Sequence, residues 1–145
     1  KEGVESFGGV EGRLQFVKIV RGVKIWNDNN ATTPEATVVA LEALKENIIL
    51  FCGGADKNIP IDDFAKKIVE KCKKIILLKG SGTEKLKPLL RDFVEVSSLE
   101  EGVTEALKGA EGGGNFLFSP AFASFGLFKN EYDRNDQFLK IVEKL

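Results

Sequence analysis

The sequence predicts an α/β domain in which helices cover both faces of a mostly parallel sheet. Two observations predict this fold. Short apolar runs, such as residues 48–52 and 75–78, alternate along the chain with segments whose apolar residues recur at helical spacing. The runs are apolar at successive positions, which is typical of strands buried on both faces of a parallel sheet. Together these features indicate a Rossmann-like, three-layer arrangement.

The start of the chain predicts an antiparallel hairpin. A β-rich run at residues 13–20 and a second one at 23–26 flank the turn Arg21-Gly22. We therefore expect an N-terminal hairpin to supply the antiparallel element of the sheet.

The elements that follow alternate helix with strand. Thr33 and Pro34 have the residue types of an N-cap and a first helical position, so a helix is expected from Pro34 onward. Ser98 and Glu101 have the spacing of a capping box at the start of another helix. The remaining expected elements are strand 48–52, helix 61–72, strand 75–78, helix 83–90, strand 93–96, helix 98–107, strand 116–118 and helix 135–145.

Length and composition predict a single folded domain. The 145 residues, 43% of them hydrophobic and eleven of them Phe, can bury a sizeable core. Residues 1–12, with Gly at positions 3, 8, 9 and 12, are predicted to be an interdomain linker, and residues 13–145 the domain. The chain has no Met and begins Lys1-Glu2, so we expect it to be a fragment of a longer protein.

Composition also disfavours several classes of function. Twenty-one basic against 22 acidic residues leave a net charge of −1, which predicts no nucleic-acid partner. Because the chain has no His and its two Cys lack C-x-x-C spacing, the usual transition-metal sites and His-based triads are excluded within it. No apolar run approaches the ~20 residues of a membrane span, and no signal peptide opens the chain, so we expect a cytoplasmic location.

Polar residues gather where the predicted strands give way to loops, which is where open α/β sheets bind ligands. Asp28 suits either a turn or a phosphoryl-accepting site, although no acidic pair precedes it to hold Mg²⁺. Lys57 follows a Gly pair and could meet a carboxylate. Ser119 and Ser124 are predicted to bracket a helix start whose free N–H groups suit an anion.

The turn Gly80-Ser81-Gly82 is similar to part of a dinucleotide-binding turn. Lys85 stands where the third Gly of that pattern should be, so a short turn that starts a helix is the better interpretation. No G-x-x-x-x-G-K-[ST] loop occurs in the chain, so we expect no nucleoside triphosphate site of that kind here.

Three segments taken together resemble a known family. They are residues 22–28 running to Ala31-Thr32, the Gly53-Gly54 loop with Asp56-Lys57, and residues 117–124 with 128–130 and Arg134. The order of these segments and their residues resemble the C-terminal domain of the Mur ligases, with the closest likeness to the D-glutamate-adding branch. The resemblance covers about residues 13–145.

The resemblance implies the lid domain of a three-domain, ATP-dependent ligase of peptidoglycan synthesis. In such an enzyme ATP phosphorylates the carboxylate of UDP-N-acetylmuramoyl-L-alanine, and the amine of D-glutamate attacks the acyl phosphate. ATP and Mg²⁺ would be bound mainly by a central domain absent from this chain. The chain alone is expected to be inactive, and the enzyme to be a monomer.

The resemblance also implies roles for individual residues. Lys57, Thr32, Ser124 and Phe125 would bind the amino acid, while Arg13 and Asp28 would reach the nucleotide. A dianionic amino acid needs a cation and directed donors, so these residue types suit it. No catalytic or metal-binding residue is expected in this chain.

The sequence departs from the family pattern at three positions. Asn30 stands where these ligases generally have Lys, Glu131 or Tyr132 where an aromatic Phe is usual, and Asn135 where a Gly is usual. An acidic residue near the ligand suggests the hypothesis that a cationic amino acid is tolerated or favoured.

Four alternatives remain open at this point. Within the class, the chain could belong to another Mur ligase or to a folylpolyglutamate-synthase relative, although residues 119–124 favour the cell-wall branch. Outside it, the chain could be a non-catalytic Rossmann-like binding or regulatory domain, or a structural interaction module.

Overall fold

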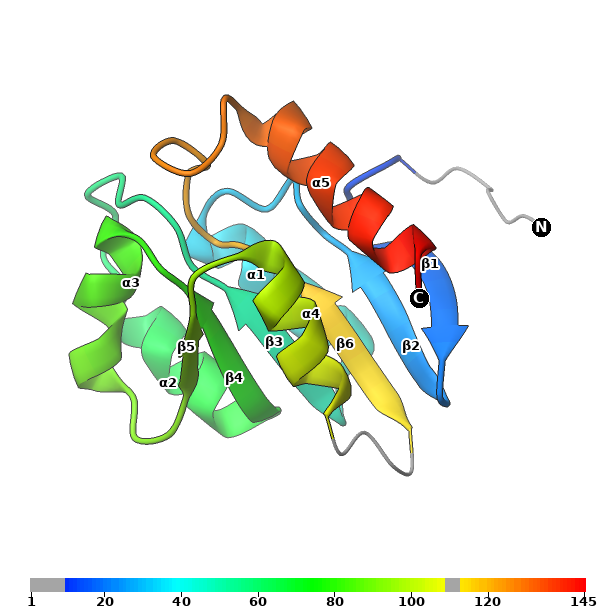
Figure 1. Ribbon diagram of the computed structural model, residues 1–145. Helices are drawn as coiled ribbons and strands as arrows, with labels where there is room; N and C mark the ends of the chain where they lie inside the picture. Colours follow the sequence, from blue (N-terminus) through cyan, green and yellow to red (C-terminus); the bar gives the residue numbers. More distant parts are fainter. Residues whose placement is uncertain (1–9, 109–112) are drawn as a thin grey trace.

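The computed structural model describes residues 10–108 and 113–145, and in these residues six strands form one sheet (Figure 1). The strand order is β1-β2-β6-β3-β4-β5. β1 pairs antiparallel with β2, and all other neighbours are parallel, so the predicted fold class and its N-terminal hairpin are confirmed. The strands are β1 (Gln15–Val20), β2 (Val23–Asn27), β3 (Ile48–Cys52), β4 (Cys72–Leu78), β5 (Val94–Val96) and β6 (Gly114–Phe118).

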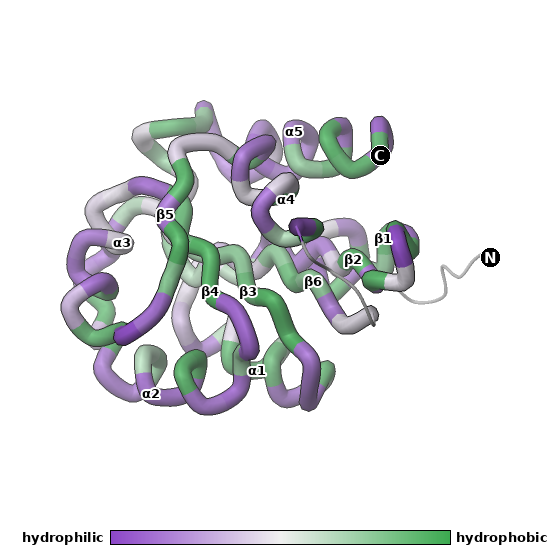
Figure 2. Tube along the Cα trace, turned by 60° about the horizontal axis from the view of Figure 1, so that its bottom comes forward, coloured by the Kyte–Doolittle hydropathy of each residue, from purple (hydrophilic) through white to green (hydrophobic). Residues whose placement is uncertain are grey.

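Helices cover both faces of the sheet. α1 (Pro34–Leu44) and α2 (Asp62–Lys71) pack on one face, and α4 (Leu99–Leu107) and α5 (Glu131–Glu143) on the other. The short α3 (Ser81–Leu86) and the 3₁₀ helix η1 (Lys87–Leu89) connect β4 to β5. Figure 2 shows the hydrophobic strand β3 in the middle of the domain, and helices along which hydrophobic and hydrophilic residues alternate.

The predicted helix starts at Pro34 and Ser98 are confirmed. The Thr33 hydroxyl accepts a hydrogen bond from Ala36 N at 3.2 Å, as an N-cap does. The Ser98 hydroxyl accepts one from Glu101 N at 3.1 Å. The Glu101 carboxylate returns to the N–H of the residue before the cap, Ser97, at 2.7 Å, so the capping box is offset by one residue.

Two predicted helix starts were wrong. The last helix begins at Glu131, four residues before the predicted 135, because the Asn130 side chain caps it by accepting from Asp133 N at 2.8 Å. The helix predicted at 83–90 begins at Ser81 and tightens into η1, which contains Pro88.

One predicted strand start was also wrong. β4 begins at Cys72, three residues before the predicted 75, because Cys72 already pairs with Ile48 of β3. The helix predicted at 61–72 accordingly ends at Lys71.

The predicted linker at residues 1–12 lies largely outside the described residues, which start at 10. The described end of this segment contacts the domain. Asn135 Nδ2 donates to the Glu11 carboxylate at 2.6 Å, and Asn30 N donates to Gly12 O at 2.8 Å. Gly12 has a φ of +84°, and a Cβ there would lie 2.6 Å from the Asn30 side-chain oxygen, so only Gly suits this contact.

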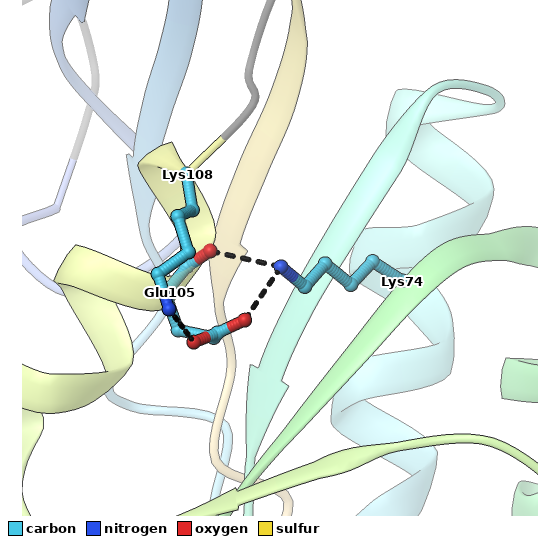
Figure 3. Close-up of polar contacts among 3 residues, drawn as sticks. All are labelled: Lys74, Glu105 and Lys108. Atoms are coloured by element: carbon cyan, nitrogen blue, oxygen red, sulfur yellow. Dashed lines mark hydrogen bonds and ion pairs between the residues drawn. The ribbon is translucent and has the colours of Figure 1, made fainter.

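At the amino-terminal edge of the sheet, an ion-pair cluster holds α4 to β4 (Figure 3). Lys74 Nζ lies 2.9 Å from a carboxylate oxygen of Glu105 and 2.9 Å from its main-chain oxygen. Lys108 Nζ lies 3.0 Å from the other carboxylate oxygen. Hydrogen bonds from Lys74 and Lys108 lower the pKa of Glu105. The cluster therefore stabilises the edge opposite to the carboxyl ends of the strands.

Within residues 10–108 and 113–145, none of the helices is long and apolar enough to cross a bilayer.

The contact between α4 and the sheet can be tested at Gly102. A Cβ at this position would overlap the ring of Phe51. We expect Gly102→Ala to lower the free energy of unfolding by about 1–3 kcal/mol through overpacking, although Ala is otherwise favoured over Gly inside a helix by ~1 kcal/mol.

Urea denaturation of the 145-residue chain measures this change. Thr104→Ala, at an exposed position of the same helix, is the control and should not destabilise. A Gly102→Ala chain as stable as the wild type would contradict the packing described.

Candidate functional site

The candidate site lies at the edge of the sheet where the parallel strands end. The chain leaves β3 toward α2, on one face, and leaves the neighbouring β6 toward α5, on the other. Loops that diverge in this way from adjacent strands open the crevice in which α/β domains bind ligands. The loop after β2 lies on the other side of β6.

Hydrogen bonds between main-chain atoms join these three loops. The loop after β6 is bonded to the loop after β2, where Ala121 N donates to Ala31 O at 2.8 Å. It is also bonded to the loop after β3, where Ala55 and Ala123 exchange hydrogen bonds of 3.0 and 3.1 Å. The loop after β6 therefore lies between the other two and holds both.

Three of the predicted ligand-binding residues adjoin these bonds. Thr32 directly follows the bond between the β2 and β6 loops. Ser124 and Lys57 follow the paired bonds between the β6 and β3 loops. The structure thus brings residues from three separate stretches of sequence to one edge of the sheet.

Glycine allows the β3 and β6 loops to approach closely. Gly54 has a φ of +149°, and a Cβ there would lie 2.6 Å from the main-chain oxygen of Ala123. Any side chain at position 54 would push the two loops apart.

The four residues predicted to bind an amino acid differ in exposure. Lys57 is exposed and Thr32 half-buried. Ser124 is only 5% exposed, whereas Phe125 beside it is 61% exposed.

Ser124 and Phe125 line a cavity of about 450 Å³. Lys57 and Thr32 are not among the residues that line it, so the structure places the four on one edge but not around one cavity. The other lining residues are Gly53, Gly54, Ala55, Leu78, Lys79, Gly80, Ser81, Ser97, Ala123, Gly126, Leu127, Phe128 and Arg134.

Asp56 orders the loop that carries Lys57. Its carboxylate lies 3.1 Å from Lys85 Nζ and accepts from Asn58 N at 3.0 Å, while its own N–H donates to the Ser81 hydroxyl at 2.9 Å. Desolvation acts to raise the pKa of Asp56, but the hydrogen bonds from Lys85 and Asn58 outweigh it, and the pKa lies below its usual value. Hydrogen bonds therefore hold the backbone on each side of Lys57 in place.

Asp28 is buried and both its carboxylate oxygens are engaged. One accepts from Leu14 N at 2.9 Å and the other from the Ser119 hydroxyl at 2.7 Å. The Thr37 hydroxyl of α1 lies 2.8 Å from the Ser119 hydroxyl and extends the network. Burial raises the pKa of Asp28, while Ser119, Leu14 and the nearby positive charge of Arg13 oppose the rise. Arg13 itself is exposed.

The prediction that Ser119 and Ser124 bracket a helix start was wrong. Residues 119–130 form no helix in the structure, and the helix begins only after Asn130. Ser119 N donates to Phe51 O at 3.1 Å, so it is not a free N–H group. The hydroxyl of Ser119 orients Asp28 instead of capping a helix.

The positions that depart from the family pattern contact their neighbours. Asn30 is exposed and its amide donates to Glu11 O at 3.3 Å. Asn135 is buried and accepts from Asn27 Nδ2 at 2.8 Å. Glu131 is exposed at the first position of α5, and its main-chain oxygen accepts from Asn29 Nδ2 at 2.9 Å.

Sequence reasoning assigned no role to Asn29 or Thr37, and it named Arg134 only as part of a motif. The structure buries all three in the polar network beneath the loops. Arg134 bonds Asn29 and Thr37 bonds Ser119, and nothing in the local sequence indicates these contacts because the partners lie 105 and 82 residues apart.

The described residues do not fit a metal site of their own. Within 10–108 and 113–145, no three His, Cys, Asp or Glu side chains gather closely enough to hold a metal ion. Asp28, on the loop after β2, is a single carboxylate whose two oxygens each accept one hydrogen bond. An oxygen-rich Mg²⁺ site therefore needs ligands from elsewhere.

Comparison with known proteins gives consistent results. Residues 12–122 match the family model described as "Mur ligase, glutamate ligase domain". The chain is 41% identical to the UDP-N-acetylmuramoylalanine–D-glutamate ligase of Roseiflexus sp. (strain RS-1), over 99% of this chain and 32% of the relative. It is 43% identical to the enzyme of the same name from Borreliella afzelii (strain PKo), over 98% of this chain and 33% of the relative.

A solved structure shares the fold. The murein peptide ligase of Psychrobacter arcticus superposes with a TM-score of 0.65 and 13% identity, over 97% of this chain and 32% of that protein. The chain spans about a third of the length of the curated relatives that it matches.

The buried carboxylate of Asp28 predicts a pH dependence. Since its pKa is raised in the folded state, the folded chain holds this proton to higher pH than the unfolded chain does, and stability is lost as pH rises above the usual value of 3.8. Asp28→Asn removes this effect, and its amide can still accept from Leu14 N and bond Ser119. The free energy of unfolding of Asp28→Asn relative to wild type should therefore increase as pH rises from 4 to 7.

Urea denaturation at several pH values measures the difference between the two chains, in which the contributions of all other carboxylates cancel. Asp136→Asn, an exposed position on α5, should show no comparable trend. A relative stability that falls with rising pH would contradict the raised pKa.

Proposed function

Because this chain belongs to the Mur ligase family, as its glutamate ligase domain, we propose that it is the amino-acid-binding part of a larger enzyme that joins D-glutamate to UDP-N-acetylmuramoyl-L-alanine. The observation that carries the proposal is that main-chain hydrogen bonds join the loops after β2, β3 and β6. Thr32, Lys57 and Ser124 follow these bonds in the sequence, one on each loop. The two relatives at 41% and 43% identity, both named as D-glutamate ligases, support this branch over a folylpolyglutamate synthase.

We propose that residues 13–145 are the domain and residues 1–12 the linker to the rest of the enzyme. The share of the relatives that this chain spans, about a third, leaves room for further domains. ATP and Mg²⁺ would be held mainly there, because the described residues offer no carboxylate cluster for the metal. Bound ATP supplies the phosphoryl group that activates the acceptor carboxylate.

Lys57 is proposed to pair with a carboxylate of D-glutamate. It is exposed on a loop that Asp56 orders, so its ammonium can reach a ligand while its backbone stays in place. The hydroxyls of Thr32 and Ser124 would donate to the same ligand, and Phe125 would cover its apolar carbons. Such charge-assisted bonds contribute ~1.5–3 kcal/mol each.

Arg13 and Asp28 are proposed to contact the nucleotide across the cleft. Asp28 is oriented by Ser119 and Leu14, and each carboxylate oxygen keeps a further lone pair for a donor of the ligand. Arg13 is exposed near this carboxylate and would meet a phosphate.

Held in this way, the amino acid would present its amine to the activated acceptor. The amine nitrogen attacks the acyl carbon, a C–N bond forms, the C–O bond to phosphate breaks, phosphate leaves, and the nitrogen gives up one proton to become the amide N–H. The part of this chain in the reaction is to hold and orient the nucleophile. We propose the cytoplasm as its location, in keeping with the two free cysteines.

The clamp can be tested with Lys57→Ala in the full-length parent enzyme. The loss of one charge-assisted bond should raise the KM for D-glutamate about 10- to 150-fold, while the KM for the UDP-linked substrate stays the same. Because Lys57 is exposed, the melting temperature should not change. Steady-state kinetics with each substrate varied in turn measures this.

Lys67→Ala, an exposed lysine on α2, is the matched control. An unchanged KM in Lys57→Ala would refute the carboxylate clamp. A wild-type parent that turns over neither D-glutamate, L-glutamate nor D-lysine would refute the ligase function itself.

The hypothesis that Glu131 lets the enzyme accept a cationic amino acid is tested by measuring which amino acids the parent enzyme turns over. If Glu131 favours a cation, the wild type should turn over D-lysine, and Glu131→Gln should reduce the ratio of D-lysine to D-glutamate turnover several-fold. Competition assays with both amino acids measure the ratio. Exclusive use of D-glutamate by the wild type would show the hypothesis to be wrong.

A further inference from the structure

Arg134, on the first turns of α5, is the largest of the fully buried side chains in the described structure. Burial lowers its pKa to about 10, so it still carries its charge at neutral pH. None of the ion pairs among the described residues includes it. A buried cation without a carboxylate partner is costly, so its neighbours must explain its presence.

The hydrogen bonds of Arg134 run to neutral oxygens on two separate loops. Nε donates to the side-chain oxygen of Asn29 at 2.7 Å, and Nη2 donates to its main-chain oxygen at 3.1 Å. Nη1 donates to the main-chain oxygen of Phe122 at 3.2 Å. One guanidinium therefore joins α5 to the loop after β2 and to the loop after β6.

A further bond locks the same junction from the other side. Asn29 Nδ2 donates to Glu131 O at the start of α5. Asn29 therefore forms hydrogen bonds through its side-chain oxygen, its side-chain nitrogen and its main-chain oxygen. Asn29 directly follows Asp28 and precedes Thr32 on the same loop, and Phe122 precedes Ser124 on the other. The residues that Arg134 holds thus lie within three residues, on the same loops, of those proposed to contact the ligands.

Only a guanidinium can make this set of bonds. It presents five N–H donors in a planar fork, whereas an ammonium is a single point that cannot reach acceptors on two loops in fixed directions. Removal of the fork leaves three oxygens in the interior without this donor, and an unpaired buried acceptor drives the chain around it to rearrange.

Arg134 does not act by touching a ligand. Arg134 is among the residues that line the cavity with Ser124 and Phe125, but its side chain is inaccessible to solvent, and each of its three nitrogens donates to an oxygen of the chain itself. A direct salt bridge to a substrate would require an exposed N–H group.

We propose that Arg134 is a positioning residue that sets the distance between the β2 and β6 loops, and so determines the affinity for both the amino acid and the nucleotide. The inference rests on the proposed ligase function. It predicts that loss of the fork acts on binding as well as on stability.

The test compares Arg134→Met and Arg134→Lys with wild type in the full-length parent enzyme, with Arg91→Met, an exposed arginine outside the site, as control. We expect Arg134→Met to raise the KM for D-glutamate and the KM for ATP by at least about tenfold, because both loops lose their common anchor. The KM for the UDP-linked substrate should not change. Arg134→Lys keeps the charge but not the fork, so both KM values should stay raised.

A residue that only stabilises the fold would lower the amount of active enzyme, and thus the apparent kcat, but leave each KM unchanged. That result in a folded Arg134→Met enzyme would overturn the proposal, and so would wild-type KM values in Arg134→Lys.

If Arg134→Met does not fold, Asn29→Ala is the deciding variant. It removes the side-chain acceptor of the fork and the bond to Glu131 O, but it keeps the two main-chain acceptors, Asn29 O and Phe122 O. A rise in the KM for D-glutamate and ATP in Asn29→Ala supports the proposal, and unchanged values overturn it. A wild-type parent without ligase activity would refute the proposed function and this inference with it, whereas an active wild type with unchanged variants refutes the inference alone.

Discussion

The need to satisfy the main chain of a buried loop governs the arrangement of this domain. Residues 119–124, which follow β6, are all buried, yet they form neither helix nor strand. Polar main-chain groups in such a segment must find partners outside it. The partners come from the strands and loops on both sides: Ser119 N bonds Phe51 O, Gly53 N bonds Pro120 O, Ala121 N bonds Ala31 O, Ala123 pairs with Ala55, and Phe122 O accepts from Arg134.

The geometry of the candidate site follows from this constraint. A loop on the surface could relax into water, but this one is coupled to three neighbouring segments by directed bonds. The residues proposed to bind ligands lie next to those bonds, so a preorganised backbone positions their side chains. Preorganisation of this kind lowers the entropy that binding must overcome. Lys57 is an example: its side chain is exposed, while hydrogen bonds of Asp56 hold the backbone on either side of it.

This arrangement buries two ionisable side chains, Asp28 and Arg134. They do not pair with each other; each is satisfied by neutral donors or acceptors from segments distant in sequence. Replacing either by an apolar side chain of the same shape would leave its partners unsatisfied. Buried polar networks of this type serve to define one conformation of a site more than to increase stability.

The sequence by itself determined the fold class, the N-terminal hairpin, the helix starts at Pro34 and Ser98, and the family. These depend on local properties: apolar periodicity, the residue types of caps and turns, and the residue sequences of three short segments. It misplaced the start of α5, although Asn130 and Asp133 have capping residue types, and it read Ser119 as part of a helix start. Ser119, Asn29, Thr37 and Arg134 owe their roles to partners between 82 and 105 residues away or on other elements. Only the tertiary structure decided these roles. The hydrogen-bond partners of a buried loop depend on which strands and helices pack around it, and this packing leaves no local pattern in the sequence.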